Sequence, residues 1–186
     1  MKPETRVLGI DDAPFDKFQD KEVLVIGCFY RSNKLLEGVM STKATVDGDD
    51  ATEKIIQMIN NSKFKTQIHA IFLDGIAVGG LNIIDIAELN NKIGIPVIIV
   101  IRRDPRIDKI IDVLTNLKMP QKIKYLKNAS KVYKYNNIYF QKAGITEEKA
   151  KEFLKISIKA SDIPEAVRIA HIIGAGIVKG ESSGRA

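Results

Sequence analysis

Six consecutive residues in the middle of the chain, 96–101, carry no polar side chain and read Pro-Val-Ile-Ile-Val-Ile. A strand with one solvated face alternates apolar and polar residues, so an unbroken run predicts a strand covered on both faces. Such strands belong to sheets with helices packed above and below them. The chain has 186 residues, 45% of them hydrophobic, which is enough to bury a sheet of this kind. We therefore expect an α/β fold.

The segments on either side of this run alternate between strand and helix patterns. Strands are expected at 6–10, 23–30, 35–46, 68–73 and 96–101, with a hairpin of 132–135 and 138–141. Helices are expected at about 50–61, 81–92, 104–117 (with Pro105 in its first turn), 146–159 and 163–179, followed by a flexible tail at 180–186. A three-strand antiparallel meander followed by strand–helix–strand units predicts a mixed sheet with helices on both faces. Ribonuclease H-like folds share that order, here in a single domain over 1–186.

Charge and composition narrow the classes of partner and location. Lys and Arg outnumber Asp and Glu by 29 to 23, and the net charge of +6 suits a nucleic acid. The alternative is a lysine-rich surface of the thermophile type. The longest apolar runs are too short to cross a bilayer, and residues 1–6 lack the apolar stretch of a signal peptide. We expect a cytoplasmic protein with no membrane partner, and the sequence does not indicate its oligomeric state.

Aspartates follow two of the expected strands at the point where each strand ends. Asp11 and Asp12 follow the first strand, and Asp74 follows the strand at 68–73. The carboxyl ends of parallel strands are where open α/β sheets bind ligands. If these two strands are neighbours, the aspartates can share a cation, and oxygen ligands of this kind select Mg²⁺ or Mn²⁺. The alternative is that each aspartate only begins a turn, since Asp-Gly is a common turn dipeptide.

Glu53 is a further acidic candidate in the first turn of the expected helix at 50–61. Its spacing from Asp50 is that of a capping box, in which the glutamate side chain accepts a bond from the backbone N–H of the cap residue. Capping would explain Glu53 without any chemistry. The sequence alone leaves both interpretations open.

Three polar residues are candidates for contact with a phosphate or for proton transfer. His171 lies in the last expected helix, one turn after Arg168, and its alternative role is structural. Arg102 and Arg103 follow the apolar strand at 96–101, at a carboxyl end where a guanidinium can meet a phosphate. Exposed ion pairing with Asp104 is the alternative for the two arginines.

Several short motifs lie in a fixed order along nearly the whole chain. They are Gly-Ile-Asp-Asp-Ala-Pro-Phe at 9–15, Val-Asp-Gly-Asp-Asp-Ala-Thr-Glu at 46–53, Leu-Asp-Gly-Ile at 73–76, the segment 163–171 ending in Arg-Ile-Ala-His, and Gly-Glu-Ser at 180–182. In order and spacing these motifs resemble endonuclease V, and more closely an uncharacterised, largely archaeal family related to it.

The resemblance implies a ribonuclease H-like fold and metal-dependent cleavage of phosphodiester bonds in DNA or RNA. The first-strand aspartate of endonuclease V matches Asp11, and its strand-end aspartate matches Asp74. Its glutamate stands 21 positions earlier, and 74 − 21 = 53 falls on Glu53. Its C-terminal histidine matches His171, and a lysine after its later strand corresponds to Arg102. The resemblance thus implies Asp11, Glu53 and Asp74 as ligands of Mg²⁺ or Mn²⁺. In a nuclease of this kind Asp12, directly after Asp11, is a further candidate ligand.

The resemblance does not extend to the segments with which endonuclease V recognises a lesion. Its Pro-Tyr-Ile-Pro-Gly wedge is replaced by Thr45-Val46-Asp47-Gly48, and its His-Pro-Arg after Asp-Gly has no counterpart. The sequence therefore predicts the metal centre of endonuclease V but not its recognition of a damaged base. The alternative function is a non-catalytic module that retains the acidic site and binds a nucleic acid or a partner, because a fold does not fix a function.

Overall fold

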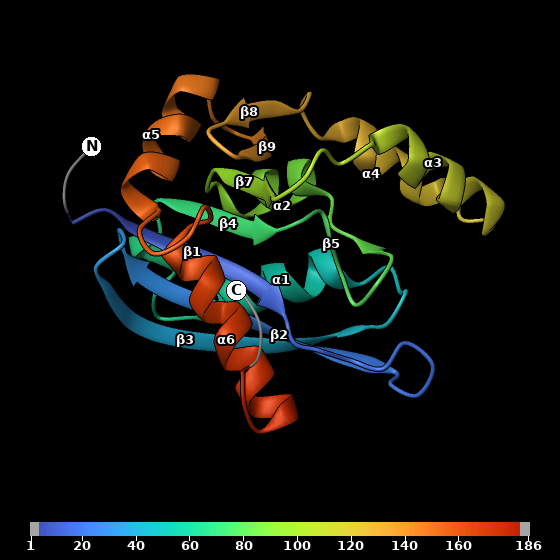
Figure 1. Ribbon diagram of the computed structural model, residues 1–186, viewed down its shortest axis with the longest axis horizontal. Helices are drawn as coiled ribbons and strands as arrows, with labels where there is room; N and C mark the ends of the chain where they lie inside the picture. The colour runs from blue at the N-terminus through green and yellow to red at the C-terminus, as the bar shows by residue number, and fades with distance from the viewer. Residues whose placement is uncertain (1–3, 183–186) are drawn as a thin grey trace.

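A seven-stranded mixed sheet forms the centre of the computed structural model, which describes residues 4–182 (Figure 1). The strand order is β3-β2-β1-β4-β7-β9-β8. β1, β4 and β7 run parallel, while β2, β3, β8 and β9 pair antiparallel with their neighbours. The strands are β1 (Arg6–Asp12), β2 (Glu22–Arg31), β3 (Leu35–Thr45), β4 (Ala70–Asp74), β7 (Val97–Ile101), β8 (Tyr133–Tyr135) and β9 (Ile138–Ala143). The expected meander and the mixed sheet are both confirmed.

Helices cover both faces of this sheet. On one face α1 (Ala51–Asn60) and α2 (Ile86–Ile93) share a hydrophobic core with Leu8 and Ile71. On the other face α5 (Glu147–Ser157) and α6 (Glu165–Lys179) share a core with Phe72 and Ile98. The remaining helices are α3 (Ile107–Asn116), α4 (Ile123–Asn128) and two 3-10 turns, η1 (Lys65–Gln67) and η2 (Pro120–Lys122). None of the helices in residues 4–182 combines the length and apolarity needed to span a bilayer.

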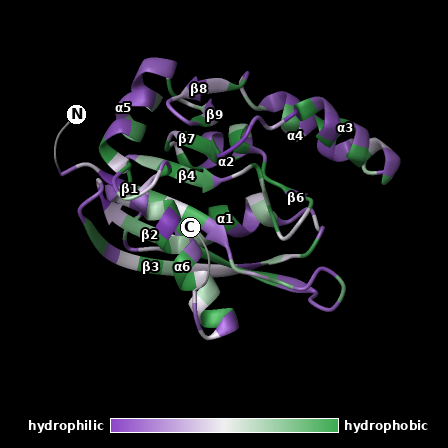
Figure 2. Ribbon diagram, in the orientation of Figure 1, coloured by the Kyte–Doolittle hydropathy of each residue, from purple (hydrophilic) through white to green (hydrophobic). Residues whose placement is uncertain are grey.

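The apolar run that predicted a doubly covered strand forms β7. Its residues Val97 to Val100 are completely buried. β7 lies between β4 and β9, and side chains alternate between the two cores, with Ile99 in one and Ile98 in the other. Figure 2 shows β4 and β7 as hydrophobic ribbons between the helical layers. The expectation that the apolar run forms a strand covered on both faces is confirmed.

The expected helix at 81–92 is wrong in its first part. Residues Asn82–Ile83 form β6, which pairs with β5 (Ala77–Val78), and α2 begins only at Ile86. Asn82 is held in place by tertiary bonds, because its side chain accepts from the Ala51 amide at 3.0 Å and donates to the Thr45 carbonyl at 2.8 Å. The Asp85 side chain then caps α2.

The region after β7 also differs from the expectation. α3 begins at Ile107, so Pro105 precedes the helix instead of occupying its first turn. Arg106 has a φ of 43°, a left-handed conformation that interrupts the helical path at this point. The 3-10 turn η2 and helix α4 after it were not expected. The expectation of a flexible tail at 180–186 falls mainly on 183–186, outside the described residues.

Candidate metal centre

Helix α6 crosses β1 at close range because Gly9 has no side chain. A Cβ atom at Gly9 would lie 2.2 Å from the carbonyl carbon of Ala166 and 2.4 Å from the amide nitrogen of Val167. Non-bonded atoms do not approach a Cβ atom this closely, so no larger residue fits there without moving the helix. The contact places the middle of α6, where His171 lies, over the carboxyl end of β1.

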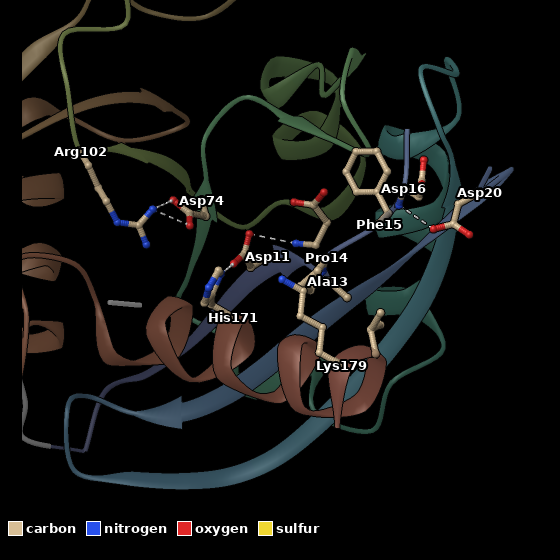
Figure 3. A pocket seen from close by; sticks show the side chains of 12 residues that line it. Asp11, Ala13, Pro14, Phe15, Asp16, Asp20, Asp74, Arg102, His171 and Lys179 are labelled. Carbon is tan, nitrogen blue, oxygen red and sulfur yellow. Dashed lines mark hydrogen bonds and ion pairs between the residues drawn. The ribbon is translucent and has the colours of Figure 1, made fainter. Parts of the chain in front are cut away.

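Strand register brings the two strand-end aspartates together. The parallel strands β1 and β4 pair Ile10 with Leu73, so the next residues, Asp11 and Asp74, leave the sheet at the same edge. The Asp11 carboxylate points toward His171, which projects from α6, and the Asp74 carboxylate points toward Arg102 (Figure 3). One ligand atom from each of Asp11, Asp74 and His171 lies within 4.8 Å of the others. The expectation that neighbouring strands would unite these aspartates is met by this pairing.

Each carboxylate of this cluster has a cationic or N–H partner. His171 Nδ1 lies 2.9 Å from Asp11 Oδ2, and the amide of Asp12 donates to Asp11 Oδ1 at 2.9 Å. Arg102 Nη1 donates to both carboxylate oxygens of Asp74 at 2.9 Å (Figure 3). Asp11 is only 5% exposed, whereas His171 is partly exposed. The cluster thus has a buried floor and an open side.

Burial and like charge work against ionisation of Asp11. The pKa of Asp11 is raised to about 7, chiefly by loss of hydration. The bond from His171 opposes this rise, and the negative charges of Asp74 and Asp12 contribute to it. The same bond to Asp11 raises the pKa of His171 above its usual range. A cation placed among these groups would relieve the repulsion between the carboxylates.

The cluster opens into a cavity of about 810 Å³. Arg102 lies at one end of the cavity, and Asp16 and Asp20 lie at the other, with Lys179 from the end of α6 on the same side (Figure 3). Sequence reasoning did not find Asp16, Asp20 or Lys179 as lining residues. Asp16 and Asp20 follow Asp11 closely in the chain, which was the available signal, whereas Lys179 resembles any lysine at a helix end.

Asp12 and Arg103 take different places around this cavity. Asp12 lines it, and its Oδ2 accepts from the Gly79 amide at 2.9 Å. Burial raises the pKa of Asp12, and the bond from Gly79 opposes that rise. Arg103 is exposed and is not among the lining residues, although it directly follows Arg102.

Glu53 lies on α1, and among residues 4–182 it does not join the group of Asp11, Asp74 and His171. Its side chain is exposed, and its Oε1 accepts from Gln57 Nε2 at 2.7 Å within the same helix. The capping alternative is not realised either, because the Asp50 side chain makes no capping bond and instead accepts from Thr45. Glu53 therefore stays a predicted ligand that rests on the resemblance alone.

The donor atoms of the cluster fit a divalent cation. Carboxylate oxygens are the ligands that Mg²⁺ prefers, and Mn²⁺ accepts an imidazole nitrogen as well. Asp11 and Asp74 supply such oxygens, and His171 supplies a nitrogen at the same place. The raised pKa of Asp11 shows that the protein alone does not fully compensate its charge.

Comparison with known proteins places the chain in a family. A family model described as endonuclease dU matches residues 3–178. The chain belongs to the endonuclease dU family. A UPF0215 protein of the archaeon Methanothermobacter thermautotrophicus is 41% identical over 191 residues, which cover 100% of this chain and 94% of the relative. The resemblance to an archaeal family related to endonuclease V is thereby confirmed.

Solved structures similar to this endonuclease dU family member support the same fold. A crystal structure of a protein of unknown function from Archaeoglobus fulgidus has a TM-score of 0.87 and 37% identity, covering 93% of this chain and 98% of the other. Endonuclease V of Ciona intestinalis, solved with a DNA containing an inosine, has a TM-score of 0.56 and 18% identity, covering 89% and 82%. The ribonuclease H-like fold expected from the sequence is confirmed.

Proposed function

We propose that this protein is a Mg²⁺- or Mn²⁺-dependent endonuclease that hydrolyses phosphodiester bonds in DNA or RNA. The observation that carries the proposal is the convergence of Asp11, Asp74 and His171 within 4.8 Å at the floor of an open cavity. Membership of the endonuclease dU family and the fold shared with endonuclease V support it. The net charge of +6 suits a polyanionic substrate.

The residues of the cluster have distinct roles in this proposal. Asp11 and Asp74 hold the cation, which when bound supplies a water molecule of lowered pKa and positive charge beside the phosphate. His171 Nδ1, bonded to Asp11, holds or passes a proton at the open side of the cluster. Arg102, 44% exposed, neutralises phosphate charge while it remains next to Asp74.

Three further residues belong to the proposal with weaker structural support. Asp12 lines the cavity and contributes negative charge beside Asp11. Glu53 joins the cation only if substrate or metal draws its side chain out of its bond with Gln57. Arg103, which is exposed and directly follows Arg102 in the chain, can contact a phosphate outside the cavity.

A non-catalytic binding module is the second candidate. It is favoured by the position of Glu53, because the described cluster holds two carboxylates and a histidine instead of three carboxylates. It is also favoured by Arg102, whose guanidinium supplies a positive charge to Asp74 without any metal. This candidate predicts association with a nucleic acid and no turnover.

Cleavage assays with an isosteric variant separate the two candidates. Protein with Mn²⁺ or Mg²⁺ is incubated with single-stranded, branched, inosine-containing and deoxyuridine-containing oligonucleotides. Asp74→Asn should lower cleavage at least about 100-fold, because it removes a charged oxygen ligand from the cation. Asp112→Asn, on the exposed side of α3, is the matched control and should cleave like the wild type.

Direct measurement of Mn²⁺ binding by electron paramagnetic resonance accompanies the cleavage assay. Asp74→Asn should bind Mn²⁺ more weakly while its thermal midpoint without metal stays close to that of the wild type. Cleavage that survives unchanged in Asp74→Asn would contradict the proposed centre. Tight nucleic-acid binding with no cleavage of any substrate would favour the binding module.

A further inference from the structure

The segment between β1 and β2, residues 13–21, presents an aromatic ring to solvent at its tip. Phe18 is 95% exposed, and the next most exposed large hydrophobic residue in the described part of the chain, Ile177, is 61% exposed. In Figure 1 this blue loop projects beyond the sheet on the right. A phenyl ring stabilises a fold when it is buried away from water. The Phe18 ring is almost fully exposed, so it contributes little to the free energy of unfolding.

Hydrogen bonds within the loop fix the backbone that carries this ring. Asp16 Oδ1 accepts from the amides of Phe18 at 2.8 Å and Gln19 at 3.2 Å. Asp20 Oδ2 accepts from the Asp16 amide at 2.7 Å, and the Asp20 amide donates to the Asp16 carbonyl at 2.9 Å. Side chains that bond to nearby amides hold a turn in one conformation. The backbone that carries the ring is therefore held in one conformation at the tip of the loop.

The same loop forms one wall of the cavity that contains the candidate metal centre. Asp16 and Asp20, on either side of the tip, both line the cavity (Figure 3). Phe18 follows Asp11 by seven positions, and a chain of seven residue steps spans at most about 25 Å. Stacked base pairs are about 3.4 Å apart, so the ring lies within about seven base steps of a phosphate held at Asp11.

Two lysines and two aspartates lie close to the tip along the chain. Lys17, with 51% of its side chain exposed, pairs with Asp47 at 3.5 Å, and Lys21 follows the tip, whereas the carboxylates of Asp16 and Asp20 are bonded within the loop. Lys179 lines the cavity from the end of α6. An aromatic ring with lysines beside it suits a nucleic acid, because rings stack on bases of any sequence while lysines neutralise phosphates.

We propose that Phe18 is a specificity-determining residue that stacks on an unpaired base, or enters between two bases, within about seven base steps of the phosphate bound in the cavity. This inference rests on the proposed function, since it needs a nucleic acid in that cavity. An apolar side chain enters most easily where bases are weakly stacked or unpaired. The protein would therefore prefer substrates in which bases near the bound phosphate are unpaired or weakly stacked.

A tryptophan probe tests the stacking directly. The chain contains no tryptophan, so Phe18→Trp introduces a single indole whose emission can be followed alone. The variant is combined with Asp74→Asn to prevent cleavage and is titrated with a single-stranded oligonucleotide and with a fully paired duplex. The emission should fall saturably, at lower concentrations of the single strand than of the duplex. Leu117→Trp in the same background is the control, and its emission should stay constant.

Affinity measurements by fluorescence anisotropy complete the test. Phe18→Ala should bind the single-stranded oligonucleotide about tenfold more weakly, because one base loses its aromatic partner. Phe18→Tyr should restore most of the affinity, and Phe18→Leu should restore less. The thermal midpoint and the Mn²⁺ affinity of Phe18→Ala should match those of the wild type, since the Phe18 side chain is 95% exposed.

The outcomes distinguish this inference from the proposed function. If the wild type cleaves nucleic acid but Phe18→Trp is not quenched and Phe18→Ala binds as tightly, the inference is wrong and the proposed function stands. If the wild type neither binds nor cleaves any oligonucleotide, both fail together. Emission of Phe18→Trp that changes with protein concentration alone would assign the ring to contact between copies of the chain and overturn the inference.

Discussion

At its amino end β1 places Arg6 beside Glu37, whereas at its carboxyl end it places Asp11 beside Asp74. Glu37 accepts from Arg6 Nε at 2.6 Å and also pairs with Arg31, and these bonds lower its pKa. Burial instead raises the pKa of Asp11 to about 7, despite its bond from His171. One end of the strand compensates a carboxylate with two guanidinium groups, and the other leaves a carboxylate partly uncompensated. Electrostatic strain of the second kind is typical of a functional site.

The largest effect should come from Gly9→Ala, which disrupts the carboxyl end and spares the amino end. The new Cβ would lie 2.2 Å from the Ala166 backbone, so α6 must move away from β1. We expect a loss of about 3 kcal/mol in the free energy of unfolding, measured with denaturant. Gly176→Ala in the same helix is the control, because its Cβ meets no atom within 4 Å. The control should be neutral or up to about 1 kcal/mol more stable, since alanine favours helix.

Asp11→Asn should stabilise the protein at alkaline pH, by less than Gly9→Ala destabilises it. The unfolded carboxyl ionises near pH 3.8 and the folded one near pH 7, so the wild type loses stability as the pH rises through that interval. The variant lacks this loss and should be on the order of 1–2 kcal/mol more stable at pH 8 in the presence of a chelator. Added Mn²⁺ should raise the thermal midpoint of the wild type and not that of the variant. Lower stability of Asp11→Asn at pH 8 would show that the carboxylate is compensated after all.

Glu37→Gln should have the smallest effect on the free energy of unfolding, and it should lower that free energy at neutral pH. Its folded pKa lies below the ordinary 4.5, so the wild type gains stability from Glu37 above that pH and loses it as the pH falls further. The variant should be less stable at pH 7 and should show a flatter decline in acid, measured by unfolding between neutral pH and pH 3. Glu22→Gln, whose side chain is 54% exposed beside Lys43, should leave the profile unchanged.

Strand-borne parts of the candidate site were more predictable than helix-borne parts. Asp11 and Asp74 follow apolar runs, and once two strands are parallel neighbours their register fixes where the next residues lie. Glu53 sits on a helix, where rotation about the axis decides the direction of the side chain, and its sequence spacing does not report that rotation. The position of His171 over Asp11 depends on the contact of Gly9 with α6, which no local pattern reveals.

Tertiary bonds explain the parts of the fold that periodicity did not predict. The residues Ile83, Ile84, Ile86 and Leu89 have apolar spacing close to that of a helix. Asn82 is nevertheless tied to α1 and β3, and Ile83 pairs with Ala77 in the strand β6. Lys122, in a lysine-rich stretch, resembles a solvated surface residue. It is instead 1% exposed, and its Nζ donates to the carbonyls of Asp47, Gly48 and Leu81 at 2.7–2.8 Å. Neither arrangement has a signal in the neighbouring sequence.

The bond between His171 and Asp11 joins residues 160 positions apart, and this separation has a consequence for synthesis of the protein. A ribosome adds about 5–20 residues per second, so roughly 8–30 s pass between the incorporation of Asp11 and that of His171. During this interval the early strands can pair while α6 does not yet exist. The nascent chain, still close to messenger RNA, therefore carries an incomplete centre until translation has passed the helix that completes it.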